Sequence, residues 1–180
     1  MSHLLSSFAL SQPVKRAVFI SYHHGGDQAY YDAFVNAFDG TYDILSDNSL
    51  EREIDSDDVN YVLQRIRDTC VKGSSCTIVL CGAETPWRKY VDWEIEATLE
   101  TEHGIIGVNL PTSKKNTLGQ VTVPNRLFDN IQSKYVVWVN WNDFTASSSS
   151  VQAYIEQAIA KPKQTIVNTR EAMARNGTPP

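Results

Sequence analysis

Apolar residues gather in five short runs, which are separated by longer segments of helical periodicity. The run at residues 76–81 is almost continuously apolar, as is typical of a strand buried on both faces of a sheet. Strands that alternate with helices predict a parallel sheet covered by helices on both faces. We therefore expect an α/β domain with strands at residues 17–22, 42–45, 76–81, 105–110 and 135–141.

The helices are predicted from apolar residues that recur every three or four positions and from polar residues that cap the ends. Asp27 is the expected cap of the first helix, and Ser56 or Asp57 is the expected cap of a helix at residues 59–70. The remaining helices are expected at 86–101, after a Thr85–Pro86 start, at 125–130, and from a cap within 147–150 to Ala160.

A chain of 180 residues is long enough for one domain with a proper core. Residues 14–160 carry the alternating pattern and are expected to form that domain. Residues 1–13 form an N-terminal extension in this interpretation. Residues 161–180 have weak periodicity and are expected to form a partly helical tail with a frayed end.

The net charge and the lengths of the apolar runs argue against two classes of partner, nucleic acids and membranes. The formal net charge is −5, the opposite of the basic surface that nucleic-acid binding requires, so no nucleic acid is expected. No apolar run approaches the roughly 20 residues of a membrane span. The N-terminus also lacks the pattern of a signal peptide. These features predict a cytoplasmic protein with no membrane contact.

The three cysteines, Cys70, Cys76 and Cys81, fit neither a disulfide framework nor a zinc-binding pattern. No other residues have the spacing of metal ligands, so no metal site is expected. We predict that the cysteines are reduced thiols in the core.

Ligands of open parallel sheets bind beyond the carboxyl ends of the strands, where the strand order reverses. The loops after Tyr22, Leu45 and Cys81 are expected to meet there. Residues 23–26 include two glycines before a helix, which allows close approach to a phosphate group, although most glycine pairs in such loops only form turns.

The helix expected at residues 86–101 has one apolar face when its residues are placed at about 100° intervals. Trp93 and Glu100 lie nearly opposite this face, so both are expected to be exposed. Glu94 lies at the margin of the apolar face, nearer to it than the other carboxylates. A desolvated functional acid and a solvated boundary residue both remain open as interpretations. Glu96 and Glu100 are expected to be solvated.

Two of these segments together resemble a known family. The run Phe-Ile-Ser-Tyr at residues 19–22, followed by Asp27, and the run Trp-Arg-Lys-Tyr-Val-Asp-Trp-Glu-Ile at residues 87–95 are similar to TIR domains. More closely, they resemble the TIR-like proteins of the bacterial Thoeris anti-phage system. The resemblance covers about residues 14–142. It implies a flavodoxin-like three-layer sandwich with a five-stranded parallel sheet of order 2-1-3-4-5.

The resemblance also implies a site and an activity. Glu94 takes the place of the family's catalytic glutamate, and NAD+ would be a substrate, with no cofactor required. Tyr90 takes the place of a tryptophan found in many TIR enzymes that cleave NAD+. The residues implied to contact the nucleotide are Phe19, Ser21, Tyr22, His23, Ser46, Asp47 and Tyr90.

One carboxylate is enough for this chemistry, because nicotinamide is a cationic leaving group that departs as a neutral molecule and needs no general acid. Glu94 would stabilise the positive charge that develops on the ribose. Capture by water would give ADP-ribose, and capture by an atom of the same molecule would give a cyclic isomer. The Thoeris resemblance favours a signal nucleotide that a separate effector protein senses.

A non-catalytic adaptor is the alternative, because a fold does not determine a function. An exposed Trp93 and the acidic loop at residues 46–57 would both suit a protein interface. The loop also predicts activation by homo-oligomerisation, in which it docks on Arg88 and Lys89 of a second copy.

Overall fold

The computed structural model describes residues 15–46 and 58–178. The N-terminal extension at residues 1–13 and most of the acidic loop, residues 47–57, therefore lie outside the described residues.

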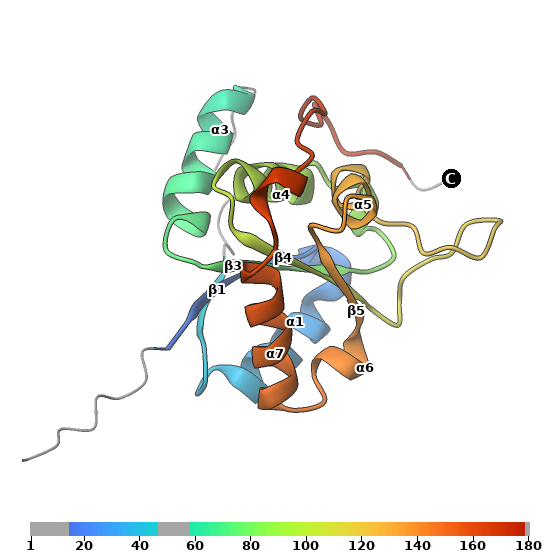
Figure 1. Cartoon of the computed structure of the whole chain (residues 1–180). Helices are drawn as coiled ribbons and strands as arrows, with labels where there is room; N and C mark the ends of the chain where they lie inside the picture. The colour runs from blue at the N-terminus through green and yellow to red at the C-terminus, as the bar shows by residue number, and fades with distance from the viewer. Residues whose placement is uncertain (1–14, 47–57, 179–180) are drawn as a thin grey trace, which may run out of the picture.

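Five parallel strands form one sheet in the order β2-β1-β3-β4-β5 (Figure 1). This order and the α/β class confirm the expected flavodoxin-like architecture. Strand β3 lies at the centre with all six residues buried, as its continuous apolar pattern predicted. The strands are β1 (Ala17–Ser21), β2 (Asp43–Ser46), β3 (Cys76–Cys81), β4 (Gly104–Asn109) and β5 (Val137–Asn140).

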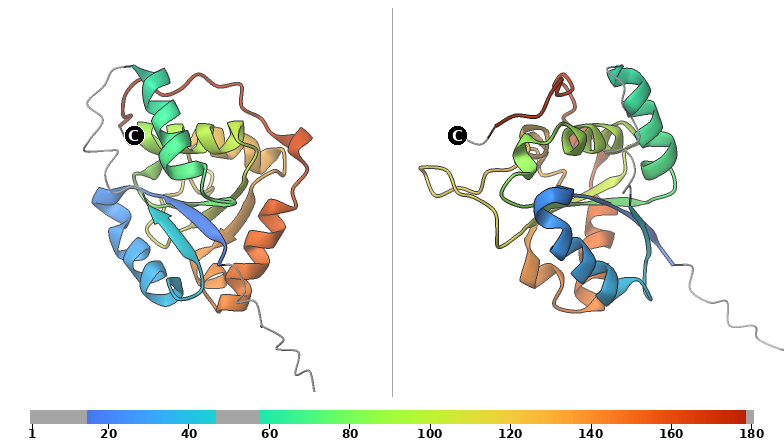
Figure 2. Two further views of the ribbon diagram at one scale, coloured as in Figure 1. Left: turned by 90° about the vertical axis from the view of Figure 1, so that its left-hand side faces the viewer. Right: turned by 180° about the vertical axis from the view of Figure 1, so that it is seen from behind.

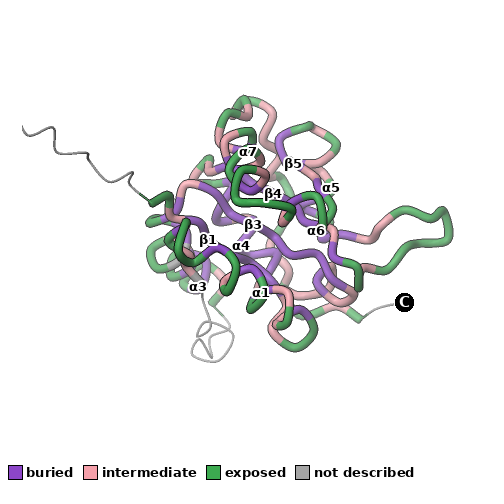
Figure 3. Tube along the Cα trace, turned by 90° about the horizontal axis from the view of Figure 1, so that it is seen from below, coloured by how far each residue is buried: buried purple, intermediate pink, exposed green. Residues whose placement is uncertain are grey.

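Helices cover both faces of the sheet and complete three layers (Figures 1 and 2). One face packs against α1, α6 and α7, and the other against α3, α4 and α5. The strands between these layers are buried along most of their length (Figure 3). The helices are α1 (His24–Phe38), α3 (Val59–Ile66), α4 (Lys89–Glu100), α5 (Asn125–Gln132), α6 (Trp141–Phe144) and α7 (Ser148–Ile159).

Three shorter helical turns connect these elements. A π-helix, η1 (Arg67–Val71), continues α3, and a 3-10 turn, η2 (Thr85–Trp87), precedes α4. The predicted helix from residue 86 is therefore divided at Arg88, which is extended. A second 3-10 turn, η3 (Lys163–Thr165), follows α7.

The helix starts agree with the predictions in part. Ser147 caps α7 as expected, and its hydroxyl accepts from the Ser150 N–H at 3.1 Å. The prediction for α1 is wrong, because α1 begins at His24 and places Asp27 in its first turn. Asp58 caps α3 by accepting from the next backbone N–H groups, and the two caps expected for this helix fall outside the described residues.

Two of the three cysteines are buried free thiols, which confirms their prediction. Burial raises the pKa of Cys76 to about 12 and raises that of Cys81 as well, so both stay protonated at neutral pH. The side chain of Cys70 lies outside the described residues.

The chain after α7 forms only the η3 turn and is otherwise irregular up to residue 178, where a partly helical tail was expected. It runs back over the layer of α4 and α5 (Figures 1 and 2). None of the described helices combines the length and apolar character needed to cross a membrane.

Candidate functional site

The strand order reverses between β1 and β3, the two neighbours at the middle of the sheet. The chain leaves β1 into α1 on one face and leaves β3 through η2 into α4 on the other. The two connections therefore diverge at the carboxyl ends of these strands, where a ligand crevice is expected. Four of the eight predicted site residues lie on the connection after β1 or on the first two turns of α4, namely Tyr22, His23, Tyr90 and Glu94.

Glu94 lies in the second turn of α4 and is only 8 % exposed. Its backbone carbonyl accepts from the Thr98 hydroxyl at 2.7 Å, and this hydroxyl lies 2.8 Å from that of Thr77 on β3. These bonds fasten the helix to the sheet beneath Glu94. The interpretation of Glu94 as a solvated boundary residue is therefore wrong, and that of a desolvated acid remains.

Tyr22 lies directly after β1 and is 3 % exposed. Its ring stacks on that of Tyr31, with 4.6 Å between centroids, and its hydroxyl donates to Gln28 Oε1 at 3.0 Å. Burial and the neighbouring Tyr31 raise the pKa of Tyr22 far above its usual value, with smaller contributions from the charges of Asp32 and Glu94. Tyr22 thus stays neutral.

Phe19 and Ser21 point to the α4 side of β1, because side chains alternate along a strand and Val18 and Ile20 pack on the α1 side. Phe19 is fully buried in a cluster with Trp93. Ser21 is also fully buried, and its hydroxyl has no hydrogen-bond partner among the described residues. Buried hydroxyls are normally bonded, so this atom is an unusual feature at the predicted ligand crevice.

His23 begins the loop from β1 to α1, and its side chain is largely buried. Its Nε2 lies 3.5 Å from Glu84 Oε2, in the loop after β3. The same carboxylate forms an ion pair with Arg88. A polar bridge thus joins the loops after β1 and β3 where the ligand crevice is expected.

A second, buried bridge joins these loops below the first. Asp27 is 2 % exposed and accepts from the Thr85 hydroxyl at 2.7 Å, and that hydroxyl accepts from the Gly82 N–H at 2.9 Å. Burial raises the pKa of Asp27, although the bond from Thr85 and the charge of His23 act in the opposite direction. Periodicity gave no sign of this pair, since the two residues are 58 positions apart.

Replacing Gly82 by alanine should lower the free energy of unfolding by about 1–3 kcal/mol, as overpacking of a tight core does. A Cβ at this position would lie only 1.9 Å from Asp27 Oδ1. Gly40 is the matched control, because nothing lies within 4 Å of a Cβ added there. Urea denaturation of both variants measures the difference, and equal stability would contradict the crowding at Gly82.

Replacing Asp27 by asparagine should change how stability depends on pH. The pKa of Asp27 is raised in the folded protein above its ordinary 3.8. The folded state therefore binds the proton more tightly, and the stability that Asp27 contributes falls as pH rises from its ordinary pKa through the higher folded value.

Asparagine keeps an oxygen that accepts from Thr85 but does not titrate. Relative to the parent, Asp27→Asn should gain stability as the pH rises above about 4, the ordinary pKa of an aspartate. Denaturant titrations across this range measure the trend, with the exposed Asp32→Asn on the same helix as a control. A difference that is constant with pH would refute it.

Trp93 is 1 % exposed, so the prediction of an exposed Trp93 is wrong. A helix at the edge of a layer has one buried face, but α4 lies between α3 and α5 and beneath the C-terminal segment. Trp93 packs toward α3, and its indole N–H donates to the Met173 carbonyl at 2.9 Å. Tyr90 contacts the Trp93 ring edge-on with 5.1 Å between centroids, and Lys89 Nζ lies 5.1 Å from both rings.

Two predicted nucleotide contacts come from the loop after β2. Ser46 ends β2 and pairs with Ile20 in the sheet, which places its backbone beside β1. The side chain of Ser46 and all of Asp47 lie outside the described residues.

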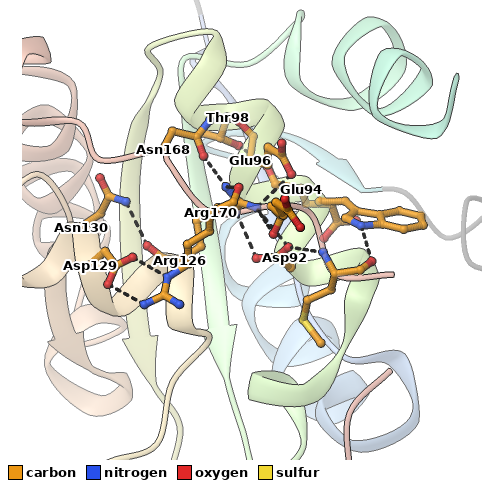
Figure 4. Close-up of polar contacts among 12 residues, drawn as sticks. Asp92, Glu94, Glu96, Thr98, Arg126, Asp129, Asn130, Asn168 and Arg170 are labelled. Atoms are coloured by element: carbon orange, nitrogen blue, oxygen red, sulfur yellow. Dashed lines mark hydrogen bonds and ion pairs between the residues drawn. The ribbon is translucent and has the colours of Figure 1, made fainter. Parts of the chain in front are cut away.

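The other acidic side chains of α4 form ion pairs with arginines (Figure 4). Asp92 and Glu96 both pair with Arg126, and Glu100 pairs with Arg67 at 2.8 Å. Glu100 is exposed as expected, but the prediction that Glu96 is solvated is wrong. Burial raises the pKa of Glu96, while the charge of Arg126 lowers it. No sequence pattern indicated this cluster, because Arg126 belongs to a different helix.

A cavity of about 480 Å³ lies on the Asp92 side of α4. Glu94 is not among its lining residues, and Asp92, its one buried carboxylate, is bonded to Arg126 through both oxygens. The cavity therefore differs from the crevice at the ends of β1 and β3. Its lining residues are Pro86, Trp87, Asp92, Thr122, Val123, Asn125, Arg170, Glu171 and Met173.

Comparison with known protein families shows which family this chain matches. A family model, that of the TIR-like domain of the Thoeris protein ThsB, matches residues 19–115, which is more than half of the chain. The matched stretch runs from β1 through β4 and includes Glu94. No curated protein matches the chain. The match confirms the resemblance on which the site was predicted: the chain belongs to the family of Thoeris ThsB TIR-like domains.

Proposed function

We propose that this chain cleaves the bond between nicotinamide and ribose in NAD+, with Glu94 as the catalytic carboxylate. The observation that carries the proposal is the position of Glu94. It is buried in the second turn of α4, the helix that follows β3, beside the point where the strand order reverses. Membership of the ThsB TIR-like family supports the same assignment.

The chemistry requires one negative charge rather than an acid–base pair. Nicotinamide departs with the electrons of the C–N bond and becomes neutral, so the positive charge moves to the ribose. A carboxylate in a water-poor site stabilises this charge electrostatically. Attack by water on the ribose carbon, with loss of a proton, gives ADP-ribose. Attack by an atom of the same molecule gives a cyclic ADP-ribose-type nucleotide.

The residues around Glu94 have roles consistent with binding this substrate. The buried hydroxyl of Ser21, which lacks a protein partner among the described residues, is suited to bond a ligand oxygen. Tyr22 stays neutral and is fixed at the end of β1 through its stack on Tyr31, in the core cluster on the α1 side. Phe19 lies beneath α4 in the core, so its contribution is to packing under the site.

Asp92 and Glu96 are poorer candidates for the catalytic role, although both are on the same helix. Both are ion-paired with Arg126, which already neutralises much of their charge. A carboxylate held by a guanidinium gives little further stabilisation to a cationic transition state. We therefore assign these two residues a structural role.

A non-catalytic adaptor is less well supported than it was from the sequence. The adaptor interpretation relied on an exposed Trp93 and on the acidic loop. Trp93 is buried, and residues 47–57 of the loop lie outside the described residues. Arg88 concerns the predicted activation rather than the adaptor: it was expected to receive the acidic loop of a second copy, and it forms an ion pair with Glu84 in its own chain.

In a Thoeris defence module, the product would act on a separate effector protein, and activity would be switched on by homo-oligomerisation. The experiment is incubation of the full chain with NAD+ over a range of protein concentrations and salt. Nicotinamide and ribosyl products are then quantified by mass spectrometry. Release of nicotinamide supports the proposal and identifies the product. No release at any concentration would leave the adaptor function.

A further inference from the structure

The chain from residue 166 to residue 177, here called the strap, crosses the helix that carries Glu94 (Figures 1 and 4). The strap has no regular secondary structure, yet its backbone is held at many points. At its start, Asn130 of α5 donates to the Val167 carbonyl at 2.7 Å and accepts from the Val167 N–H at 2.9 Å. Arg170 then forms a two-pronged ion pair with Asp129. The strap is therefore fixed on α5.

Arg126 joins the strap to α4 and is fully buried. On the α4 side, its guanidinium donates to both oxygens of Asp92, at 3.0 and 3.3 Å, and to Glu96 at 3.0 Å. On the strap side, it donates to Asn168 Oδ1 and to the backbone carbonyls of Arg170 and Glu171. One side chain thus couples two turns of α4 to three positions of the strap.

The strap also binds α4 directly, through Met173, at the two residues that precede Glu94. The Met173 N–H donates to Asp92 at 3.0 Å, and the Met173 carbonyl accepts from the Trp93 indole at 2.9 Å. Asp92 and Trp93 before Glu94, and Glu96 after it, are thus attached to the strap or to its anchor Arg126.

The first turn of α4 is completed by the strap as well. Arg88, the N-cap residue of α4, makes no side-chain cap, and Asn176 Oδ1 accepts from the Lys89 N–H at 2.9 Å instead. The Gly177 N–H donates to the Trp87 carbonyl at 2.8 Å. Asn176 therefore accepts the hydrogen bond of a backbone N–H at the start of α4. Such N–H groups are normally capped by a side chain next to the helix in sequence.

We propose that the strap positions α4, and with it the carboxylate of Glu94, and that Arg126 and Asn168 are positioning residues for the reaction. The catalytic part of this proposal rests on the proposed function. Electrostatic catalysis depends on placement, and a displacement of about 1 Å can cost roughly 100-fold in rate. The strap supplies that placement because it restrains the turn on both sides of Glu94.

The test compares two variants of adjacent strap residues in the full chain. Asn168→Ala removes the acceptor for Arg126, and Thr169→Ala changes the next residue, which is exposed and has no hydrogen-bond partner among the described residues. Hydrogen–deuterium exchange is measured for peptides that cover residues 89–100 and 163–177. Steady-state kinetics of nicotinamide release give kcat and KM separately.

We expect faster exchange in both peptides of Asn168→Ala, a fall in kcat of about tenfold or more, and a KM within about threefold of the parent. Thr169→Ala should match the parent in every measurement. Arg126→Lys, which keeps the charge but loses the fork of donors, should change exchange and kcat in the same direction. A merely stabilising strap would leave kcat unchanged at a temperature where the variants are folded.

The exchange measurement separates this proposal from the proposed function. If the parent does not cleave NAD+, the proposed function fails, and exchange of α4 still decides whether the strap holds this helix. If exchange increases in the strap of Asn168→Ala but not in α4, the proposal is overturned. It is also overturned if α4 exchanges faster while kcat of an active enzyme stays the same.

Discussion

Replacing Glu94 by glutamine should slow nicotinamide release by about 10²–10³-fold, the usual cost of removing one electrostatic contact to a transition state. Glutamine keeps the size and hydrogen-bonding capacity of the side chain and removes only the charge. Because the side chain is buried, melting curves are needed beside the kinetics to show that the variant folds.

Glu100→Gln is the matched control for this prediction. Glu100 lies on the same helix but is exposed and pairs with Arg67 at the surface. The control should retain parental activity and change stability by no more than about 1 kcal/mol. Full activity in a folded Glu94→Gln protein would remove the catalytic assignment. Equal losses in both variants would show that charge anywhere on the helix matters.

The largest expected change in stability follows from replacement of Arg126 by methionine. This change should lower the free energy of unfolding by about 3–5 kcal/mol, because it leaves two nearby carboxylates without their buried counter-charge. Asp92 and Glu96 both lose their ion pair, and the strap loses three bonds. Equilibrium urea denaturation at neutral pH measures the loss.

Arg67→Met is the control, because the pair of Arg67 with Glu100 is partly exposed and should contribute no more than about 1 kcal/mol. A triple variant, Arg126→Met with Asp92→Asn and Glu96→Gln, should recover part of the loss by removing the unpaired charges. A cost below about 1 kcal/mol for Arg126→Met alone would contradict the view of Arg126 as the centre of the cluster.

The fold was predictable because its signals are local. Each strand is a short apolar run bounded by turn residues, and the run at β3 is buried on both faces as its composition predicted. The order of the strands came from the resemblance carried by residues 19–22 and 87–95, and the sheet confirms it. The same resemblance proposed Glu94 as the catalytic acid, whereas periodicity placed it at the margin of an apolar face and left a solvated residue open.

Helical periodicity failed where a helix has more than one buried side. Trp93 and Glu96 were expected at the surface because the pattern assumes one neighbour, the sheet. In the structure, α3 covers Trp93, and Arg126 of α5 and the strap enclose Glu96. These neighbours come from distant parts of the chain, so a window of a dozen residues carries no information about them.

The pattern of apolar residues along the chain was sufficient to predict the layers. Together with the family motifs it also predicted the sheet order and pointed to Glu94 as the candidate catalytic acid. These features could be predicted because hydrophobic alternation and motif spacing involve residues that lie within a few positions of one another. Only the folded chain brought Asp27 to Thr85, left the Ser21 hydroxyl buried without a partner among the described residues, and bound the strap to α4 through Arg126. Those contacts join residues that lie tens of positions apart, and their burial and charge compensation exist only when all the layers are packed.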